Sequence, residues 1–338
     1  MRYSRVQLAG MGYELAPNVV TSAELEERVA PVYRKLGLPP GQLEALTGIR
    51  ERRWWDPGHR LTEGALAAAR KALASSGVPA SALGCVIYAG VCRESSEPAT
   101  ACAVAHGLGV SSEAAVFDLS NACLGVLNGI LDVANRIELG QIEAGLVVSC
   151  ESAREINESM IASMKADPSM EHFRLSIATL TGGSGAVALV LAAAPAEGAA
   201  RRRLLGAAYK AAPEHHDLCL WDRDFMRTDA AAVLKHGVAL GKRTFDALTR
   251  QLSWTAANVS KVVCHQVGGA HRGQVLATLG VAPEKDFSTY EFLGNIGTVS
   301  LPLTAALAEE RDFLAAGDTV AFLGIGSGLN CLMLGWEW

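Results

Sequence analysis

The sequence predicts an α/β protein built from two similar halves around buried strands. Apolar runs of strand length alternate with helical patterns along the chain, the usual order in sheets that are covered by helices. With 338 residues, 50% of them hydrophobic and 19% charged, the chain can bury a large core and should form two domains or two fused halves. The expected strands are Cys85–Ala89, Ala115–Asp118, Ala144–Ser149, Ala186–Leu191, Lys261–His265 and Val320–Gly324.

The two halves show the same order of elements, although their sequences are only faintly alike. In the first half, a strand is followed by small residues, Cys123 and a helix. In the second, Phe287–Tyr290 leads through Asn295 to a helix near Leu301–Leu314. This repetition indicates a duplicated α/β unit, in which ligands bind beyond the carboxyl ends of strands. The weakly patterned segment Ala193–Arg203 is the expected connection between the halves.

Composition and charge exclude several function classes. A net charge of -5 and a pI near 5.9 give no general electrostatic reason to bind nucleic acid or a membrane surface. No run approaches the roughly 18 apolar residues of a membrane span. The eight cysteines include no Cys-x-x-Cys pair, and no signal-peptide pattern precedes the first strand-like run, Val6–Ala9. We therefore expect a soluble, cytoplasmic protein with reduced thiols that acts on small molecules.

Cys123 is the strongest candidate for a nucleophile. It lies in Phe-Asp-Leu-Ser-Asn-Ala-Cys-Leu-Gly, between a strand and a helical pattern. We expect its thiol at or within a turn of the helix N-terminus, where free N–H groups and the helix dipole favour the thiolate. A cysteine is more often simply a small buried apolar residue. That interpretation suffices for Cys85, Cys92, Cys102, Cys150, Cys219 and Cys331.

Two later polar residues are weaker candidates when each is taken alone. His265 ends a strand and is followed by Gln266, Val267 and two glycines, but a histidine at a strand end is more often structural than catalytic. Asn295 lies in Phe-Leu-Gly-Asn-Ile-Gly-Thr-Val-Ser, where a turn or a helix cap would also explain it. A solvated role suffices for the other histidines considered, which are His215, His216 and His271.

The glycine-rich segment Gly324–Gly328 follows the last expected strand but fits a phosphate site poorly. It has neither a Lys-Ser/Thr pair nor the Rossmann spacing of glycines, and the printed sequence is nearly finished there. Its backbone N–H groups could instead line an oxyanion site.

Together, these segments resemble the ketoacyl synthase III branch of the thiolase superfamily. A cysteine, a histidine and an asparagine in this order and framework are a specific signal, and the match spans nearly the whole chain. The resemblance implies a thiolase fold, with duplicated α/β halves forming a five-layered αβαβα core. Residues 1–192 would carry Cys123, with a lid or dimer insertion around 151–181, and residues 193–338 would carry His265 and Asn295. The matching segments are Gly48–Arg53, Phe117–Gly125, Gly182–Ala188, His265–Gln266, Gly294–Asn295 and Gly324–Gly328.

Departures from the fatty-acid-initiating synthase point to one branch of the superfamily. Val267 and Gly268 replace the usual Ala-Asn, and Leu46 replaces an arginine that binds coenzyme A. Gly-Ile-Gly-Ser-Gly-Leu-Asn-Cys, Asn-Ala-Cys-Leu and Ala-Pro-Asn-Val-Val-Thr-Ser are similar to the OleA branch, the thiolases of long-chain olefin biosynthesis. The segment Ser96–Thr100 is similar as well.

The resemblance also implies a role for each site residue. Cys123 takes an acyl chain from acyl-CoA, and the N–H groups of Cys123 and Ser327 hold the oxyanion. His265 and Asn295 stabilise an enolate, and Glu97 reaches into the neighbouring subunit of a homodimer as the base. The local alternative for Glu97 is a helix-start residue, because Pro98 suits the first helical position and an acidic residue before it suits the helix dipole.

The implied activity is non-decarboxylative Claisen condensation of two fatty acyl-CoA molecules to a 2-alkyl-3-ketoacyl product, the first step of long-chain olefin biosynthesis. It implies coenzyme A thioesters as substrates, no cofactor, no metal, and downstream olefin-pathway enzymes as possible partners. The alternative is a decarboxylative ketoacyl synthase with a malonyl donor, which would need no base. A non-catalytic ketosynthase partner subunit is a third reading, disfavoured by the presence of Cys123, His265 and Asn295 together.

Overall fold

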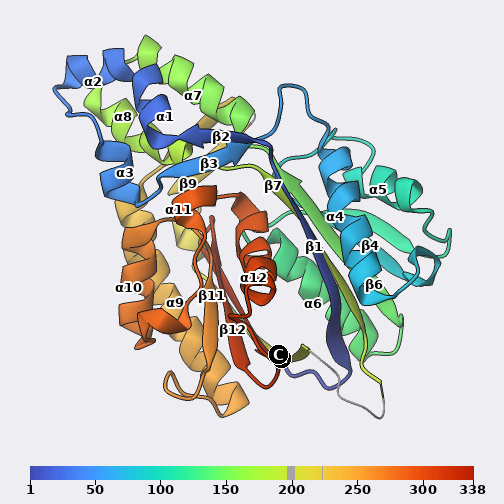
Figure 1. Cartoon of the computed structure of the whole chain (residues 1–338). Coiled ribbons are helices and arrows are strands. Elements are labelled where there is room, and N and C mark those ends of the chain that lie inside the picture. The colour runs from blue at the N-terminus through green and yellow to red at the C-terminus, as the bar shows by residue number, and fades with distance from the viewer. Residues whose placement is uncertain (196–201, 223) are drawn as a thin grey trace.

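A nine-stranded mixed sheet forms the centre of the molecule (Figure 1). The computed structural model describes residues 1–195, 202–222 and 224–338. The strand order is β11-β12-β13-β8-β1-β7-β6-β4-β5, and all six predicted strands are present. The strands are β1 (Val6–Leu15), β4 (Cys85–Ala89), β5 (Ala115–Leu119), β6 (Ala144–Glu151), β7 (Gly185–Ala193), β8 (Arg203–Ala211), β11 (Lys261–Cys264), β12 (Thr319–Gly326) and β13 (Asn330–Glu337).

The two halves of this sheet repeat one topology. The order β1-β7-β6-β4-β5 in the first half corresponds to β8-β13-β12-β11 in the second, with parallel and antiparallel pairs at matching places. The place of β5 is taken in the second half by a single parallel bridge between Val262 and Asp286. The halves join where Gln7 of β1 pairs with Arg203 of β8. The predicted duplication is therefore confirmed.

The helices form three layers, which makes five layers with the two halves of the sheet (Figure 1). One outer face is covered by α4 (Leu61–Ser76) and α5 (Thr100–Leu108), and the other by α9 (Ala230–Leu252) and α10 (Gly269–Leu279). Between them, α6 (Gly125–Glu138) and α12 (Ser300–Glu310) contact strands of both halves. Burial on every side explains why Ser300–Ala308 is almost entirely apolar or small and fully buried. The αβαβα arrangement is confirmed.

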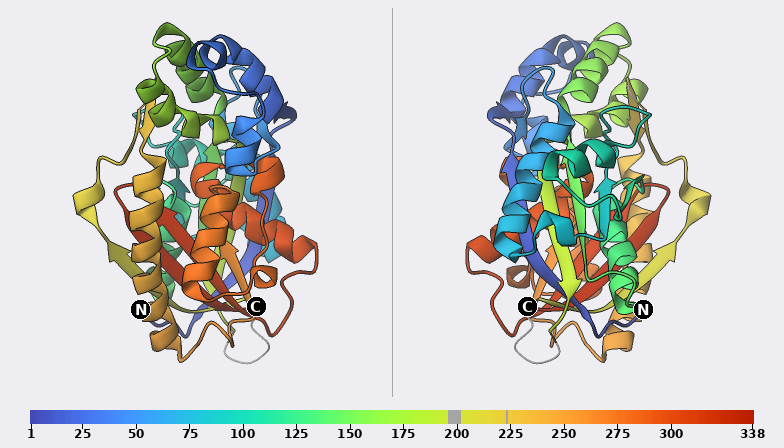
Figure 2. Two further views of the ribbon diagram at one scale, coloured as in Figure 1. Left: turned by 90° about the vertical axis from the view of Figure 1, so that its left-hand side faces the viewer. Right: turned by 90° about the vertical axis from the view of Figure 1, so that its right-hand side faces the viewer.

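A helical cap closes one end of the molecule, opposite the end where both termini lie (Figure 2). It has its own apolar core, formed by residues such as Leu25, Trp54 and Phe173. The predicted insertion around 151–181 contributes two of its helices, but a lid or dimer role for it stays a prediction. The cap contains α1 (Ser22–Arg28), α2 (Ala30–Leu36), α3 (Gln42–Thr47), α7 (Arg154–Ala166), α8 (Met170–Ser176) and the strand pair β2 (Asn18–Thr21) and β3 (Glu51–Trp54).

The connection between the halves runs from the end of β7 at Ala193 to the start of β8 at Arg203. Within it, residues 196–201 lie outside the described part of the chain, so the boundary between 192 and 193 stays a prediction.

A hairpin of β9 (Cys219–Asp222) and β10 (Phe225–Thr228) projects from the side (Figure 2). All eight cysteines are free thiols. In the described ranges, no helix is long and apolar enough to cross a membrane.

Close packing of α4 on β1 gives a prediction about stability. A Cβ on Gly12 would lie 2.4 Å from the Ala68 carbonyl oxygen, which leaves no room for alanine, whereas a Cβ on Gly273 in α10 meets nothing within 4 Å. Gly12→Ala should lower the free energy of unfolding by about 1–3 kcal/mol. The control Gly273→Ala should raise it by about 0.5–1 kcal/mol. Urea unfolding measures both, and an unchanged midpoint for Gly12→Ala would contradict this packing.

Candidate active site

The nucleophile candidate lies in a tight turn at the centre of the molecule. Cys123 follows β5 and precedes α6, which begins at Gly125, as predicted. The turn is closed by hydrogen bonds from Leu124 N–H to the Asn121 carbonyl (2.9 Å) and from Gly125 N–H to the Ala122 carbonyl (3.2 Å). Ala122 has a φ of 46°, which is unusual for a residue with a side chain. The chain thus holds a strained turn immediately before Cys123.

The glycine loop after β12 lies against this turn. A Cβ on Gly326 would be 3.5 Å from the Cys123 nitrogen, so the absence of a side chain lets the two backbones approach closely. The Asn330 amide donates to the Ser327 carbonyl (3.5 Å) and to Asn121 Oδ1 (3.4 Å), which joins the two loops. The structure therefore brings Ser327 beside Cys123.

Asn295 occupies the place in the second half that Cys123 occupies in the first, just before a central helix. Its backbone is fixed by hydrogen bonds to Thr181 and Gly183 of the first half, both 2.9 Å. Its Oδ1 accepts from Gly297 N–H (3.0 Å) and from Ser300 Oγ (3.5 Å). Because the oxygen is engaged by these two donors, the NH₂ group is the part of the side chain that remains for a ligand.

One residue that the sequence did not single out joins these two sites. Thr298 Oγ1 accepts a hydrogen bond of 2.7 Å from Val126 N–H, in the first turn of α6. Thr298 is fully buried and lies three residues after Asn295. No local pattern could reveal this contact, because its partners are 172 residues apart in the sequence. It holds the Cys123 and Asn295 segments in a fixed relation.

His265 directly follows β11, and its backbone N–H donates to the Leu323 carbonyl (3.0 Å). Burial, helped by the neighbouring His271, lowers the pKa of His265 to about 3. The imidazole is therefore neutral near pH 7 and carries one N–H donor. Its Nδ1 is buried and has no hydrogen-bond partner within the described part of the chain.

The solvated position expected for His271 is wrong. Its Nδ1 is buried, and burial lowers the pKa of His271 to about 4. The reason is tertiary: α10 packs against α9 and α3, and His271 lies within electrostatic reach of His265. His265 and His271 are therefore both neutral imidazoles near pH 7.

The expectation of a favoured Cys123 thiolate is also wrong. Burial, helped by the nearby Cys219 and Glu151, raises the pKa of Cys123 to about 12. Loss of hydration therefore outweighs the helix N-terminus as an influence on this thiol. Near pH 7 the sulfur carries its proton.

Glu151 is a buried carboxyl group that no motif in the sequence marked as a site residue. It ends β6, and its oxygens accept from Val91 N–H and Cys92 N–H, both at 2.9 Å. Burial raises its pKa. These contacts fix the start of the loop that carries Glu97.

Glu97 is exposed at the tip of the loop between β4 and α5. The far end of this loop is held by Asp118, which accepts from Thr100 N–H and Ala101 N–H, both at 2.9 Å. The helix-start alternative for Glu97 is wrong, because α5 begins at Thr100 and Asp118 binds its first N–H groups. Within one chain, the structure does not place Glu97 in the buried centre with Cys123.

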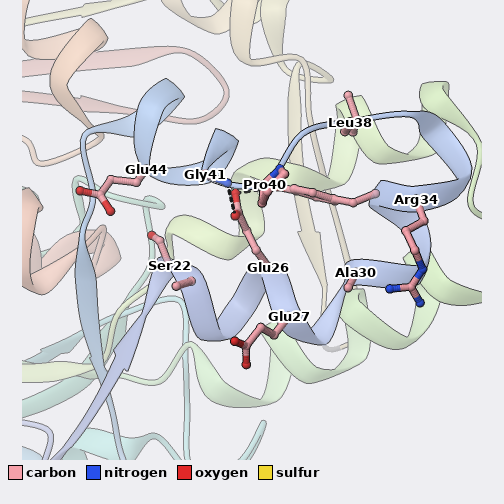
Figure 3. Close-up of a pocket in the computed structure, with 11 residues that line it drawn as sticks. Ser22, Glu26, Glu27, Ala30, Arg34, Leu38, Pro40, Gly41 and Glu44 are labelled. Carbon is pink, nitrogen blue, oxygen red and sulfur yellow. Dashed lines mark hydrogen bonds between the residues drawn. The ribbon is translucent and has the colours of Figure 1, made fainter.

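A pocket of about 420 Å³ lies apart from this centre, between α1, α2 and α3 of the cap (Figure 3). Its central carboxylate, Glu26, accepts from Gly41 N–H (2.5 Å) and Leu43 N–H (2.6 Å). Since these bonds occupy the carboxylate in holding the α2–α3 connection, Glu26 serves the fold. None of the predicted site residues lines this pocket.

Comparisons with known proteins agree with this geometry. The family described as Thiolase, N-terminal domain, matches residues 59–193, and 3-Oxoacyl-[acyl-carrier-protein (ACP)] synthase III C terminal matches residues 249–338. An acyl-CoA:acyl-CoA alkyltransferase of Shewanella oneidensis is 57% identical, with 100% of both chains covered. A crystal structure of Xanthomonas campestris OleA is 36% identical, with a TM-score of 0.97 over 100% of this chain and 98% of that one. The chain belongs to the OleA family of acyl-CoA condensing acyltransferases.

Ketoacyl synthases are more distant from this OleA-family chain. A beta-ketoacyl-[acyl-carrier-protein] synthase III of Rhodospirillum rubrum is 28% identical, with 96% of this chain and 97% of that one covered.

In the described residues, no group of His, Cys, Asp and Glu side chains could hold a metal ion.

The raised pKa of Cys123 gives a prediction about its reactivity. Only the thiolate is alkylated, so the rate of Cys123 modification by iodoacetamide should rise roughly tenfold per pH unit between about pH 6 and 9. Peptide mass spectrometry measures the rate, with the exposed Cys102 as a reference for reagent access. A rate that levels off below about pH 8 would show that the thiolate is stabilised after all.

Proposed function

We propose that this chain condenses two fatty acyl-CoA molecules without decarboxylation, giving a 2-alkyl-3-ketoacyl product. One observation carries the proposal: full-length identity of 57% and 36% to relatives named acyl-CoA:acyl-CoA alkyltransferase. One solved Xanthomonas campestris OleA variant contains lauric acid and lauroyl-CoA, which supports fatty acyl thioesters as the substrate class. The site geometry supports the proposal independently, because the duplicated halves bring Cys123 and Asn295 to one centre.

In the first step, the Cys123 sulfur attacks the thioester carbonyl of one acyl-CoA. The bond from that carbon to the coenzyme A sulfur breaks, and the thiol proton ends on the released coenzyme A. The N–H groups of Cys123 and Ser327 stabilise the oxyanion, since both belong to the two loops that meet at Gly326. A protonated thiol that loses its proton only during the attack is consistent with the high pKa of Cys123.

In the second step, Glu97 of the neighbouring subunit removes an α-proton from the second acyl-CoA. The enolate oxygen accepts hydrogen bonds from His265 and from the Asn295 NH₂ group. The α-carbon then attacks the acyl-cysteine carbonyl, the bond to sulfur breaks, and Cys123 recovers a proton from Glu97. A neutral His265 suits this role, because it donates a hydrogen bond without protonating the enolate.

Solved variants of the relative support these assignments. Crystal structures of Xanthomonas campestris OleA include variants with a substitution of one glutamate, of one cysteine and of one histidine. The intervals between them along that chain equal those between Glu97, Cys123 and His265 here. The exposed position of Glu97, on a loop that is anchored at its end by Asp118, also suits a residue that acts across an interface of a homodimer.

The proposal includes the remaining expectations from the sequence. The protein would be cytoplasmic, would need no cofactor beyond its coenzyme A thioester substrates, and would supply downstream olefin-pathway enzymes. The halves would divide at 192, with 151–181 as lid or dimer insertion. A decarboxylative synthase with a malonyl donor is the second candidate, favoured only by the relatives at 28% identity and below.

Product analysis distinguishes the two candidates. The enzyme is given one long-chain acyl-CoA, with and without a malonyl thioester, and products are identified by mass spectrometry. We expect a 2-alkyl-3-ketoacyl product from the acyl-CoA alone and none from Cys123→Ala, which should retain the fold because the replacement is small and apolar. Product that forms only with the malonyl thioester would establish the decarboxylative reaction instead.

The role of Glu97 gives a separate prediction. Glu97→Gln should abolish condensation but leave acylation of Cys123 intact, because only the α-proton transfer needs a carboxylate. The exposed Glu113→Gln is the matched control and should retain activity. A mixed dimer of Glu97→Gln and Cys123→Ala chains should regain one complete site, while each homodimer stays inactive. Inactive mixed dimers, with co-assembly verified by affinity tags, would argue against an action across the interface.

A further inference from the structure

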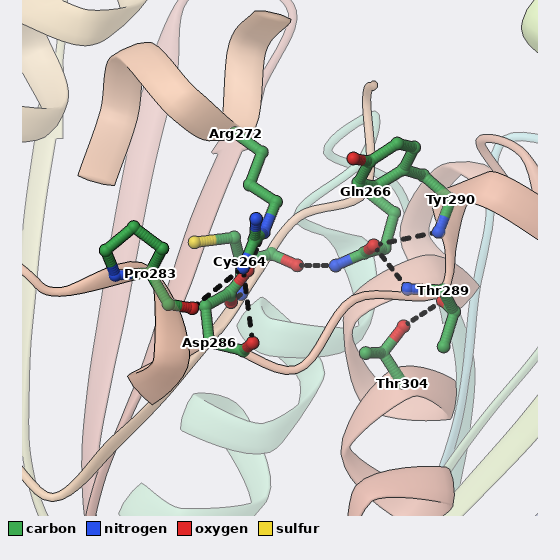
Figure 4. Close-up of polar contacts among 8 residues, drawn as sticks. All are labelled: Cys264, Gln266, Arg272, Pro283, Asp286, Thr289, Tyr290 and Thr304. Atoms are coloured by element: carbon green, nitrogen blue, oxygen red, sulfur yellow. Dashed lines mark hydrogen bonds and ion pairs between the residues drawn. The ribbon is translucent and has the colours of Figure 1, made fainter. Parts of the chain in front are cut away.

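The buried amide of Gln266, beside His265, makes three hydrogen bonds to the backbone, and these join the His265 strand to the segment before Asn295 (Figure 4). Gln266 Nε2 donates to the Cys264 carbonyl (2.6 Å), directly before His265. Its Oε1 accepts from Thr289 N–H (2.9 Å) and Tyr290 N–H (3.1 Å). Tyr290 begins α11 (Tyr290–Leu293), the short helix that leads to Gly294 and Asn295. One side chain therefore connects the His265 strand to the Asn295 segment.

Three hydroxyl groups continue this connection to the Asn295 side chain. Thr304 Oγ1 donates to the Ser300 carbonyl (2.7 Å), so it must accept from Thr289 Oγ1, which lies 2.6 Å away. Ser300 Oγ in turn accepts from Ile296 N–H (2.7 Å) and donates toward Asn295 Oδ1 (3.5 Å). Each hydroxyl has one proton, and each proton is used once. Thr289, Ser300 and Thr304 are all buried.

A separate clamp holds the strand that carries His265. Asp286 Oδ1 accepts from Cys264 N–H (3.2 Å), and its Oδ2 accepts from Arg272 Nε (2.6 Å) (Figure 4). Asp286 is buried, and burial raises its pKa while the Arg272 guanidinium opposes that rise. Because this clamp does not involve the hydroxyl groups, β11 keeps an anchor when one of them is removed.

We infer that the series Gln266, Thr289, Thr304 and Ser300, here called the relay, sets the position of the Asn295 amide relative to His265. This inference rests on the proposed role of His265 and Asn295 as donors to the enolate. Two donors can stabilise one oxygen only if both lie at hydrogen-bond distance from it, and a misplacement of about 1 Å can cost roughly a hundredfold in rate. The relay residues touch no reacting atom, so they are positioning residues.

Thr304→Val tests the relay, since it removes the hydroxyl and keeps the shape of the side chain. We expect condensation to slow roughly 10- to 100-fold while the rate of Cys123 acylation stays within about twofold. Thr304→Ser keeps the oxygen and should restore most of the condensation rate. Thr249→Val is the matched control, because Thr249 also bonds back to a carbonyl four residues earlier, from a helix on the outer face. It should leave both rates unchanged.

A double variant separates failure of this inference from failure of the proposed function. If the relay acts through Asn295, Thr304→Val should cause no further loss in an Asn295→Ala background. The relay would be overturned if the double variant condensed more slowly than Asn295→Ala by the same factor that Thr304→Val loses alone. It would also be overturned if Thr304→Val condensed at the normal rate while Asn295→Ala was slow. Normal condensation by Asn295→Ala would overturn the enolate assignment itself, and the relay with it. Should Thr304→Val fail to fold, Thr289→Val breaks the same link from the other side and is judged by the same outcomes.

Discussion

The contact between the starts of the two central helices is the constraint on which the site depends. Duplication places Cys123 before α6 and Asn295 before α12, and α6 contacts the turn Gly297–Val299 that leads into α12. The hydrogen bond from Val126 N–H to Thr298 fixes their relative position, and Gly326 lets the last strand approach the same turn. A duplicated fold thus forms one asymmetric site from two equivalent positions.

Burial determines the charge of the two ionisable candidates, Cys123 and His265. The same loss of hydration lowers the pKa of His265 to about 3 and raises that of Cys123 to about 12. Both side chains are therefore neutral over the physiological pH range, so they do not form a thiolate–imidazolium pair. In such a low-dielectric site, fixed N–H donors act strongly on a developing oxyanion. The buried hydroxyl groups of the relay are hydrogen-bonded for the same reason, because an unpaired polar group in a low-dielectric environment costs free energy.

Glu97, the proposed base, presents the opposite case, because it is exposed on the surface of the single chain. Glu97 is carried by a loop that is held at one end by Glu151 and at the other by Asp118. Both anchors accept backbone N–H groups, so the loop is positioned before any partner arrives. Anchoring at both ends reduces the entropy that the loop would lose in the proposed contact with a second subunit.

The sequence by itself determined the α/β class, the duplication and the order of the segments with Cys123, His265 and Asn295, because strand and helix periodicity and short motifs are local signals. It could not reveal Thr298 or Glu151, whose contacts join residues 172 and 60 positions apart in the chain. Nor could it reveal the relay, because its contacts depend on how the segments of Gln266, Thr289 and Thr304 pack together. The expectations of a solvated His271 and of a favoured Cys123 thiolate, both drawn from the sequence, are wrong. Those depend on how much water surrounds a side chain, and hydration is decided only when distant elements pack together.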